Sequence, residues 1–146
     1  MNFADFLREE GDDIRGEQLL RDGLALNPGD AMLHHALGLL LVRSGRTGKA
    51  LESLETAARL EPSNARFSYV LGVAQNSMGR SDDAAITLAA AYETHPGSFD
   101  IAWAYATIAR DRGDTETARE VIAVMRTRFP ANADVEALAQ QLAVEP

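Results

Sequence analysis

The chain has 146 residues, of which 46% are hydrophobic and 25% charged, an ordinary balance for a globular protein that argues against disorder. Its formal net charge of -8 disfavours nucleic acid and anionic membrane as main partners, because both require a cationic surface. The absence of cysteine excludes disulfides, thiolate metal sites and cysteine nucleophiles within this chain.

No stretch of the chain has the length of a membrane span. The longest apolar run, residues 37–42, is far shorter than the roughly 20 residues that cross a bilayer. The first ten residues also lack the cationic start and apolar run of a signal peptide. We therefore expect a soluble protein without membrane insertion, with the cytoplasm favoured over the periplasm.

Proline and glycine recur through the chain with one period. Prolines stand at 28, 62, 96 and 130, and glycines at 11, 45, 79 and 113, each 34 residues after the last. A period of 34 residues is typical of stacked helix–turn–helix repeats. The chain therefore divides into a truncated frame at 1–30, full frames at 31–64, 65–98 and 99–132, and a tail at 133–146, which we expect to form a single domain.

Helix starts and stops agree between frames. Each frame is predicted to contain a first helix, a turn at the glycine, a second helix and a stop at the proline. Residues suited to cap the first helices are Asp30, Asn64, Ser98 and Asn132. Residues suited to cap the second helices are Asp13, Thr47, Ser81 and Thr115.

Apolar residues also share positions between frames, three or four residues apart, as on one face of a helix. The first helices carry the columns Phe3, Leu37, Leu71, Tyr105 and Leu33, Phe67, Ile101. The second helices carry Leu20, Leu54, Leu88, Ile122 and the small residues Gly16, Ala50, Ala84, Ala118 and Gly23, Ala57, Ala91. Met125 breaks the last small column, so the last repeat is expected to pack more loosely or to lean against the tail.

These columns resemble the tetratricopeptide repeat. The second frame carries Leu37-Gly38, Ala50, Leu54, Ala57 and Pro62, and the third carries Leu71-Gly72, Ala84, Leu88, Ala91 and Pro96. The fourth matches less closely. The resemblance covers residues 1–132 and implies an all-α right-handed superhelix whose tail forms a capping helix. It also implies a non-catalytic protein–protein interaction scaffold, with the first helices lining a concave groove.

By the same resemblance, certain first-helix positions face the groove. They hold His35, Leu39, Arg43, Arg66, Tyr69, Val73, Asn76, Trp103, Thr107 and Arg110. Aromatic and aliphatic side chains with arginines at the edges could hold the apolar side chains of a peptide or protein segment and fix a carboxylate. The two-carboxylate clamp of chaperone-binding members is not matched, since Lys and Asn are absent from the required positions.

Two other interpretations of the aromatic residues stay open. They could pack internally, or they could be buried when the chain associates with itself as a homodimer. In the second case the chain would be a structural or oligomerisation module, and its start at position 5 of a frame is consistent with a fragment of a longer bacterial polypeptide.

The sequence gives no case for catalysis, a metal or a cofactor. His34 and His35 are adjacent on a helix and point about 100° apart, so they cannot share a metal, and we expect His34 to be an interior histidine. Residues 45–50 lack the spacing of a phosphate loop. Paired carboxylates such as Asp12-Asp13 lie at expected helix starts, where the helix dipole explains them. We therefore expect no enzyme.

Overall fold

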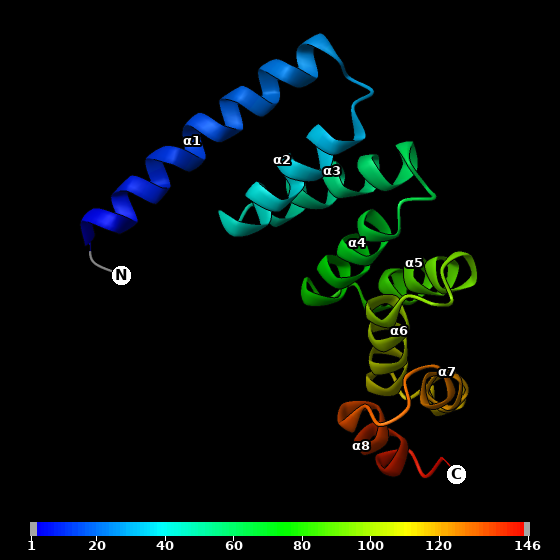
Figure 1. Ribbon diagram of the computed structural model, residues 1–146. Helices are drawn as coiled ribbons and strands as arrows, with labels where there is room; N and C mark the ends of the chain where they lie inside the picture. The colour runs from blue at the N-terminus through cyan, green and yellow to red at the C-terminus, as the bar shows by residue number, and fades with distance from the viewer. Residues whose placement is uncertain (1–2, 145–146) are drawn as a thin grey trace. The chain divides into compact units, whose positions relative to one another are not determined.

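The computed structural model describes residues 3–144, with side chains from residue 11 onward, and this part of the chain forms eight α-helices and no strand (Figure 1). The helices are α1 (Phe3–Leu26), α2 (Ala31–Arg43), α3 (Thr47–Leu60), α4 (Ala65–Ser77), α5 (Ser81–Thr94), α6 (Phe99–Asp111), α7 (Thr115–Arg128) and α8 (Ala133–Gln141). The predicted all-α fold class is confirmed. Contacts divide the chain into one unit of residues 1–67 and a second of residues 68–146.

The predicted caps of α2, α4, α6 and α8 are confirmed. Each side-chain oxygen accepts a hydrogen bond from a backbone N–H three residues on, at 3.0 Å for Asp30, 3.3 Å for Asn64, 3.4 Å for Ser98 and 3.1 Å for Asn132. A cap of this kind stabilises a helix by about 1 kcal/mol. These four residues therefore define where the helices begin.

The predicted caps of the second helices are wrong by one residue. Thr47, Ser81 and Thr115 are the first residues of their helices. The cap position belongs to the residue before, whose carbonyl accepts the first helical bond, as Arg46 does from the N–H of Ala50 at 3.0 Å. Arg46 makes no side-chain cap, whereas Asp114 accepts from the N–H of Thr117 at 3.2 Å.

The reason for the shift lies in the turn glycines. Gly45, Gly79 and Gly113 have φ of 76°, 80° and 81°, which side chains rarely adopt. The backbone N–H of the residue after the glycine donates a hydrogen bond to the last turn of the preceding helix. For example, the N–H of Arg46 donates to the carbonyl oxygen of Leu41 at 2.9 Å. This closure, a Schellman motif, leaves only one residue between the glycine and the new helix.

The predicted break at Gly11 is wrong, because α1 runs without interruption from Phe3 to Leu26 (Figure 1). Gly11 does not have a positive φ, and a glycine inside a helix costs only about 1 kcal/mol.

Asp13, predicted as a cap, instead accepts a hydrogen bond from Nε of Arg43 at 3.2 Å. Glu17 pairs with Arg46 and Arg21, and these bonds lower its pKa to about 2. The predicted truncated repeat is thus replaced by one long helix attached to the turn after α2.

In the first unit, α2 and α3 pack through a glycine. A Cβ on Gly38 would lie 2.6 Å from Leu54, which is fully buried. Ala31, Ala57 and Phe67 form a small core beside this contact. Ala50 and Ala57, two of the small residues in the second-helix columns, are fully buried, and a Cβ on Gly38 would lie 3.3 Å from the carbonyl oxygen of Ala50.

The second unit repeats this contact and adds a larger core at its C-terminal end. A Cβ on Gly72 would lie 2.6 Å from Leu88. The larger core joins α6, α7 and α8 and contains Ala106, Ile122, Met125 and Leu138. Met125 is buried in one cluster with Val135 and Leu138 of α8, so the expectation that the last repeat leans on the tail is confirmed.

In the part of the chain that the structure describes, no helix combines the length and the apolarity needed to cross a membrane.

Gly72→Ala is expected to lower the free energy of unfolding by about 1–3 kcal/mol, because the added methyl group meets Leu88, which has no room to move. Urea unfolding followed by circular dichroism measures the change. The matched control is Gly48→Ala in α3, where a Cβ meets nothing within 4 Å and stability should be unchanged or slightly higher. Equal stability of Gly72→Ala and the wild type would contradict the close approach.

Gly11→Ala tests the uninterrupted α1. In a continuous helix, alanine at this open position should raise the free energy of unfolding by about 0.5–1 kcal/mol and increase the helical signal. At a turn it should do the opposite, and Gly45→Ala, at φ 76°, provides that comparison. A loss of stability in both variants would restore the break at Gly11.

Candidate functional site

The predicted groove residues of the first unit lie in unlike surroundings. Leu39 is 38% exposed, although it is apolar, and Arg43 is exposed beside Asp13. Arg66 is exposed and has no ion pair among the side chains of residues 11–144. Arg66 is therefore the predicted groove arginine of this unit whose charge is available to a ligand.

His35 differs from these three residues because it is 4% exposed. Its ring stacks on Phe67 with the centroids 4.5 Å apart and the planes at 30°. Neither ring nitrogen has a hydrogen-bond partner among the described residues. Burial, and secondarily the charge of Arg66, lower the pKa of His35. The imidazole is consequently a neutral packing residue, as one of the open interpretations holds, rather than an exposed groove contact.

His34, its neighbour, is half-buried, and its Nε2 lies 2.8 Å from the carbonyl oxygen of Pro28. This contact gives the ring the partner that an interior histidine requires. Across the described residues, no group of three or more histidine and carboxylate side chains could hold a metal ion.

In the second unit, α4 and α6 each carry three predicted groove residues with the same spacing. We call these six residues the α4–α6 face: Tyr69, Val73 and Asn76 on α4, and Trp103, Thr107 and Arg110 on α6. A spacing of four and then three residues places each set on one side of its helix. Tyr69 packs against a buried cluster that contains Ala84 and Leu88 of α5 and Ala104 and Ile108 of α6, so α4 and α6 contribute to the same core.

The side chains of the α4–α6 face are all half-buried or exposed. Val73 is 39% exposed, close to the value of Leu39 at the same position of its repeat. Trp103 is half-buried and stacks on Phe99, with ring centroids 6.0 Å apart and planes at 8°. Asn76 is exposed, and the hydroxyl of Thr107 donates to the carbonyl of Trp103 at 2.9 Å. The face thus presents apolar and polar groups together.

Arg110 lies at the end of this face and is held by its neighbours. Its guanidinium pairs with Asp111 at 2.8 Å and donates from Nη1 to Oε1 of Gln141 in α8 at 3.3 Å. Arginine has five N–H donors, so such contacts leave donors for a carboxylate. The predicted arginine at the edge of the face is therefore fixed in position.

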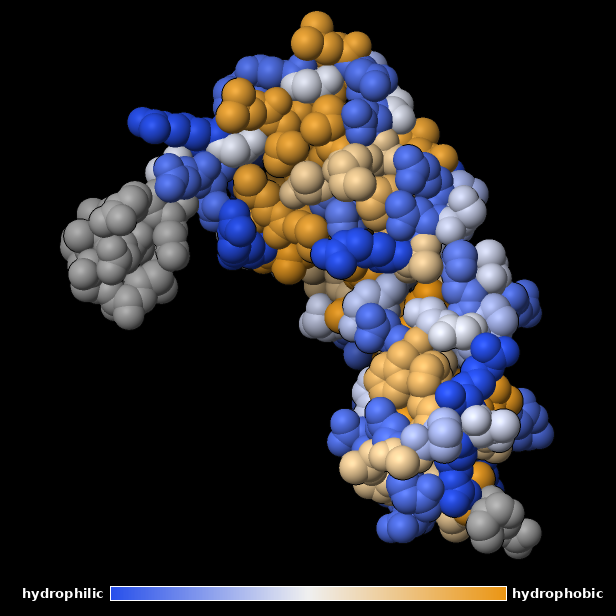
Figure 2. All heavy atoms as spheres, viewed as in Figure 1, coloured by the Kyte–Doolittle hydropathy of each residue, from blue (hydrophilic) through white to orange (hydrophobic). Residues whose placement is uncertain are grey.

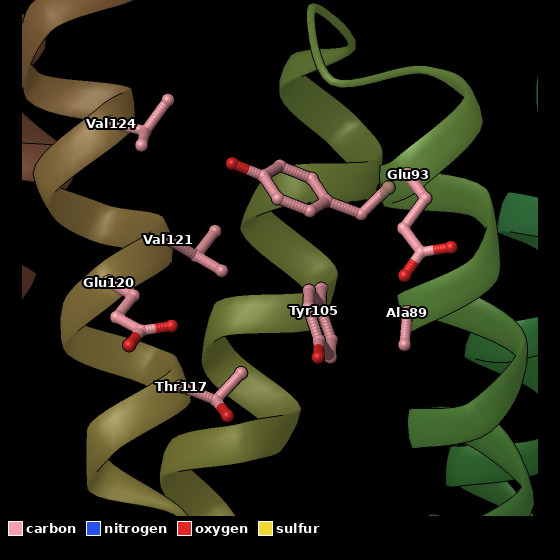
Figure 3. A pocket seen from close by; sticks show the side chains of 8 residues that line it. Ala89, Glu93, Tyr105, Thr117, Glu120, Val121 and Val124 are labelled. Atoms are coloured by element: carbon pink, nitrogen blue, oxygen red, sulfur yellow. The ribbon is translucent and has the colours of Figure 1, made fainter.

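A second feature of this unit, which the groove positions do not predict, is a pocket of about 350 Å³ between α5, α6 and α7 (Figure 3). Its lining residues come from all three helices and are Ala89, Tyr92, Glu93, Tyr105, Thr117, Glu120, Val121 and Val124. None of them belongs to the α4–α6 face. The sequence does contain an indication of this pocket, because tyrosine replaces another residue type at two repeat positions. Tyr105 occupies the position of Leu37 and Leu71, and Tyr92 occupies the position of Ala58.

Two neighbouring tyrosine rings line this pocket. The centroids of Tyr92 and Tyr105 are 5.7 Å apart, with the planes tilted by 44°. Burial raises the pKa of Tyr105, and the charges of Asp114, Glu93 and Glu120 raise it too, while a hydrogen bond with Thr117 acts in the opposite direction. The phenol therefore stays protonated and lies in a negative potential.

Comparison with known proteins supports the repeat assignment. The family model described as tetratricopeptide repeat matches residues 35–99 and 77–133. No curated protein matches the chain in sequence.

Solved structures with the same fold are similar over most of the chain. The structure of YrrB, described as a TPR protein with an unusual peptide-binding site, has a TM-score of 0.77 and 20% identity over 97% of this chain and 73% of that one. MamA has a TM-score of 0.77 and 19% identity over 99% of this chain and 86% of its own. The Arabidopsis OM64 TPR domain has a TM-score of 0.66 and 13% identity over 77% and 93%. At these identities the likeness shows the fold alone.

His35 is expected to make stability depend on pH. Because its pKa in the folded state lies below the ordinary value of about 6.5, the unfolded chain binds the proton more readily. The contribution of His35 to stability is therefore complete above pH 6.5 and is lost as the pH falls below that value.

His35→Phe should keep the stack on Phe67 and remove this part of the pH dependence, measured as urea midpoints between pH 7.5 and 5. His34→Gln is the control and should leave the pH dependence in place. An unchanged profile in His35→Phe would show that the imidazole is not buried.

Proposed function

We propose that this chain, which belongs to the tetratricopeptide repeat family, is a non-catalytic scaffold. It binds a peptide or protein segment along the first helices of its repeats. The tetratricopeptide fold is in general a protein–protein interaction scaffold and is typically non-enzymatic. The finer part of the proposal, the place of binding, concerns the α4–α6 face.

The observation that carries this proposal is the mixed character of the α4–α6 face. An apolar side chain of a ligand could contact Val73 and the half-buried ring of Trp103. Asn76 and Thr107 offer hydrogen bonds beside these apolar groups. Aromatic and aliphatic anchors next to a few polar groups are the usual basis of segment recognition.

The fixed guanidinium of Arg110 favours a ligand with a carboxylate. Asp111 and Gln141 hold the arginine in place, so binding costs little side-chain entropy. A carboxylate next to an apolar side chain, as in a peptide that ends or continues with an acidic residue, would satisfy both parts of the face. The peptide-binding site stated for YrrB gives a precedent within the same fold.

Self-association is the second candidate function, and the first unit favours it. Three large apolar side chains of α1 are well exposed, namely Ile14, Leu19 and Leu26, the last at 90%. Figure 2 shows hydrophobic residues gathered on the visible face of this unit, in the upper part of the view. A second copy of the chain could cover them, which would make the chain an oligomerisation module.

A pull-down with wild type and a Tyr69→Ala/Trp103→Ala double variant tests the scaffold proposal. The double variant is expected to lose partners that the wild type retains, since each truncated aromatic anchor weakens binding by about tenfold or more. Ile86→Ala, an exposed apolar residue of α5, is the matched control and should retain them. Equal partner sets for all three proteins would overturn the proposal.

Two further measurements separate a loss of binding from a loss of the fold and from self-association. Val73→Gln changes an exposed position, should leave the urea midpoint within about 0.5 kcal/mol of wild type, and should also weaken binding. Light scattering identifies the second candidate: a stable dimer that Leu19→Ser/Leu26→Ser converts to monomer would establish self-association through α1.

A further inference from the structure

The pocket between α5, α6 and α7 combines charges and rings that the scaffold proposal does not use. Figure 3 shows Glu93 of α5 and Glu120 of α7 on opposite walls, with Tyr105 of α6 between them. Its volume of about 350 Å³ is at the small end for ligand sites, so it suits one side chain rather than a large molecule.

Both carboxylates at the pocket are available. Within residues 11–144, neither Glu93 nor Glu120 takes part in an ion pair. Other acids of this unit are paired, as Asp82 is with Arg112 at 2.5 Å. The pocket therefore carries two negative charges that nothing in the described chain neutralises.

Arg119 and Arg126 of α7 do not supply the missing charge, because they turn toward α8 and the segment after it. Arg128 does not line the pocket, and its guanidinium lies beside Gly97, in the turn after α5. Nε of Arg119 donates to the carbonyl of Leu142 at 2.7 Å. Arg126 pairs with Glu136 at 3.0 Å. The charges of Glu93 and Glu120, which act after burial and Asp114 in raising the pKa of Tyr105, thus have no ion-pair partner within residues 11–144.

The two tyrosines of the lining specify the kind of cation. Tyr92 and Tyr105 are both half-buried, and their tilted rings present faces as well as edges. A planar guanidinium stacks on a tyrosine face and also donates to carboxylates, whereas an ammonium is compact and more strongly hydrated. Val121 and Val124 provide apolar surface for the methylene groups of a long side chain.

From this combination we propose that the pocket binds the side chain of an arginine from a partner protein. The guanidinium lies between the carboxylates of Glu93 and Glu120 and over the tyrosine rings. This site is independent of the α4–α6 face, with which it shares no residue. The chain therefore has a second recognition surface, selective for a basic segment.

The test is an NMR titration of the full chain with N-acetyl-arginine amide, with N-acetyl-citrulline amide as the neutral probe of nearly the same shape. Saturable shifts at Tyr92, Tyr105, Glu93 and Glu120 are expected with the arginine probe and not with citrulline. N-acetyl-lysine amide should bind about fivefold more weakly. Equal response to citrulline, or equal affinity for lysine, would overturn the assignment.

Two variants locate the binding. Tyr105→Leu installs the residue that Leu37 and Leu71 provide in the other repeats, so the fold should be retained while the ring is lost. Glu93→Gln/Glu120→Gln removes both charges. Each is expected to weaken binding about fivefold or more, with circular dichroism confirming a folded chain.

The matched control for charge is Glu52→Gln/Glu116→Gln, which removes two exposed carboxylates outside the pocket and should leave affinity unchanged. An equal loss in this control would show nonspecific attraction by an acidic protein and overturn the proposal. A wild-type dimer that N-acetyl-arginine amide dissociates would make a second copy the source of the arginine, which would also overturn it.

Discussion

The close approach of two helices inside a repeat is the constraint on which the rest of the structure depends. Where Gly38 faces Leu54 and Gly72 faces Leu88, there is no space for even one more carbon atom. Short helices of this length are marginal alone, so they persist because such contacts bury their apolar sides. The turn glycines and the capping residues then fix where each helix ends and the next begins. Side chains on the outer sides of the helices can consequently differ from one repeat to the next.

The repeat itself could be predicted because its signals are local and recur. Caps such as Asp30 and Ser98, and the left-handed Gly45, depend on chemistry within one turn of the chain. The second-helix caps were misplaced by one residue because the hydrogen bonds that close the turn at the glycine decide the helix start. The continuous α1 could not be predicted either, since a glycine breaks a helix only when packing or the turn requires it.

The candidate site was harder to predict, because a column of equivalent positions does not guarantee equivalent surroundings. His35, Tyr69 and Trp103 share one repeat position, yet His35 is buried against Phe67 whereas Trp103 is half-buried beside Phe99. The pocket was missed for the opposite reason. Tyr105 lies in a core column, which predicts packing alone, although a tyrosine needs a polar partner and so differs from the leucines it replaces.

Trp103 and Tyr105 are two residues apart on α6, which turns their side chains by about 200° and so places them on opposite sides of the helix. The helix α6, roughly 10 Å in diameter, therefore separates two chemically unlike surfaces. One of these combines Trp103 and Thr107 with the cation of Arg110, and the other combines tyrosine rings with the carboxylates of Glu93 and Glu120. Under the two proposals made above, a single short helix carries two independent specificities, and each would change by substitution without loss of the other. Bivalence of this kind would let one small chain hold two different segments at the same time.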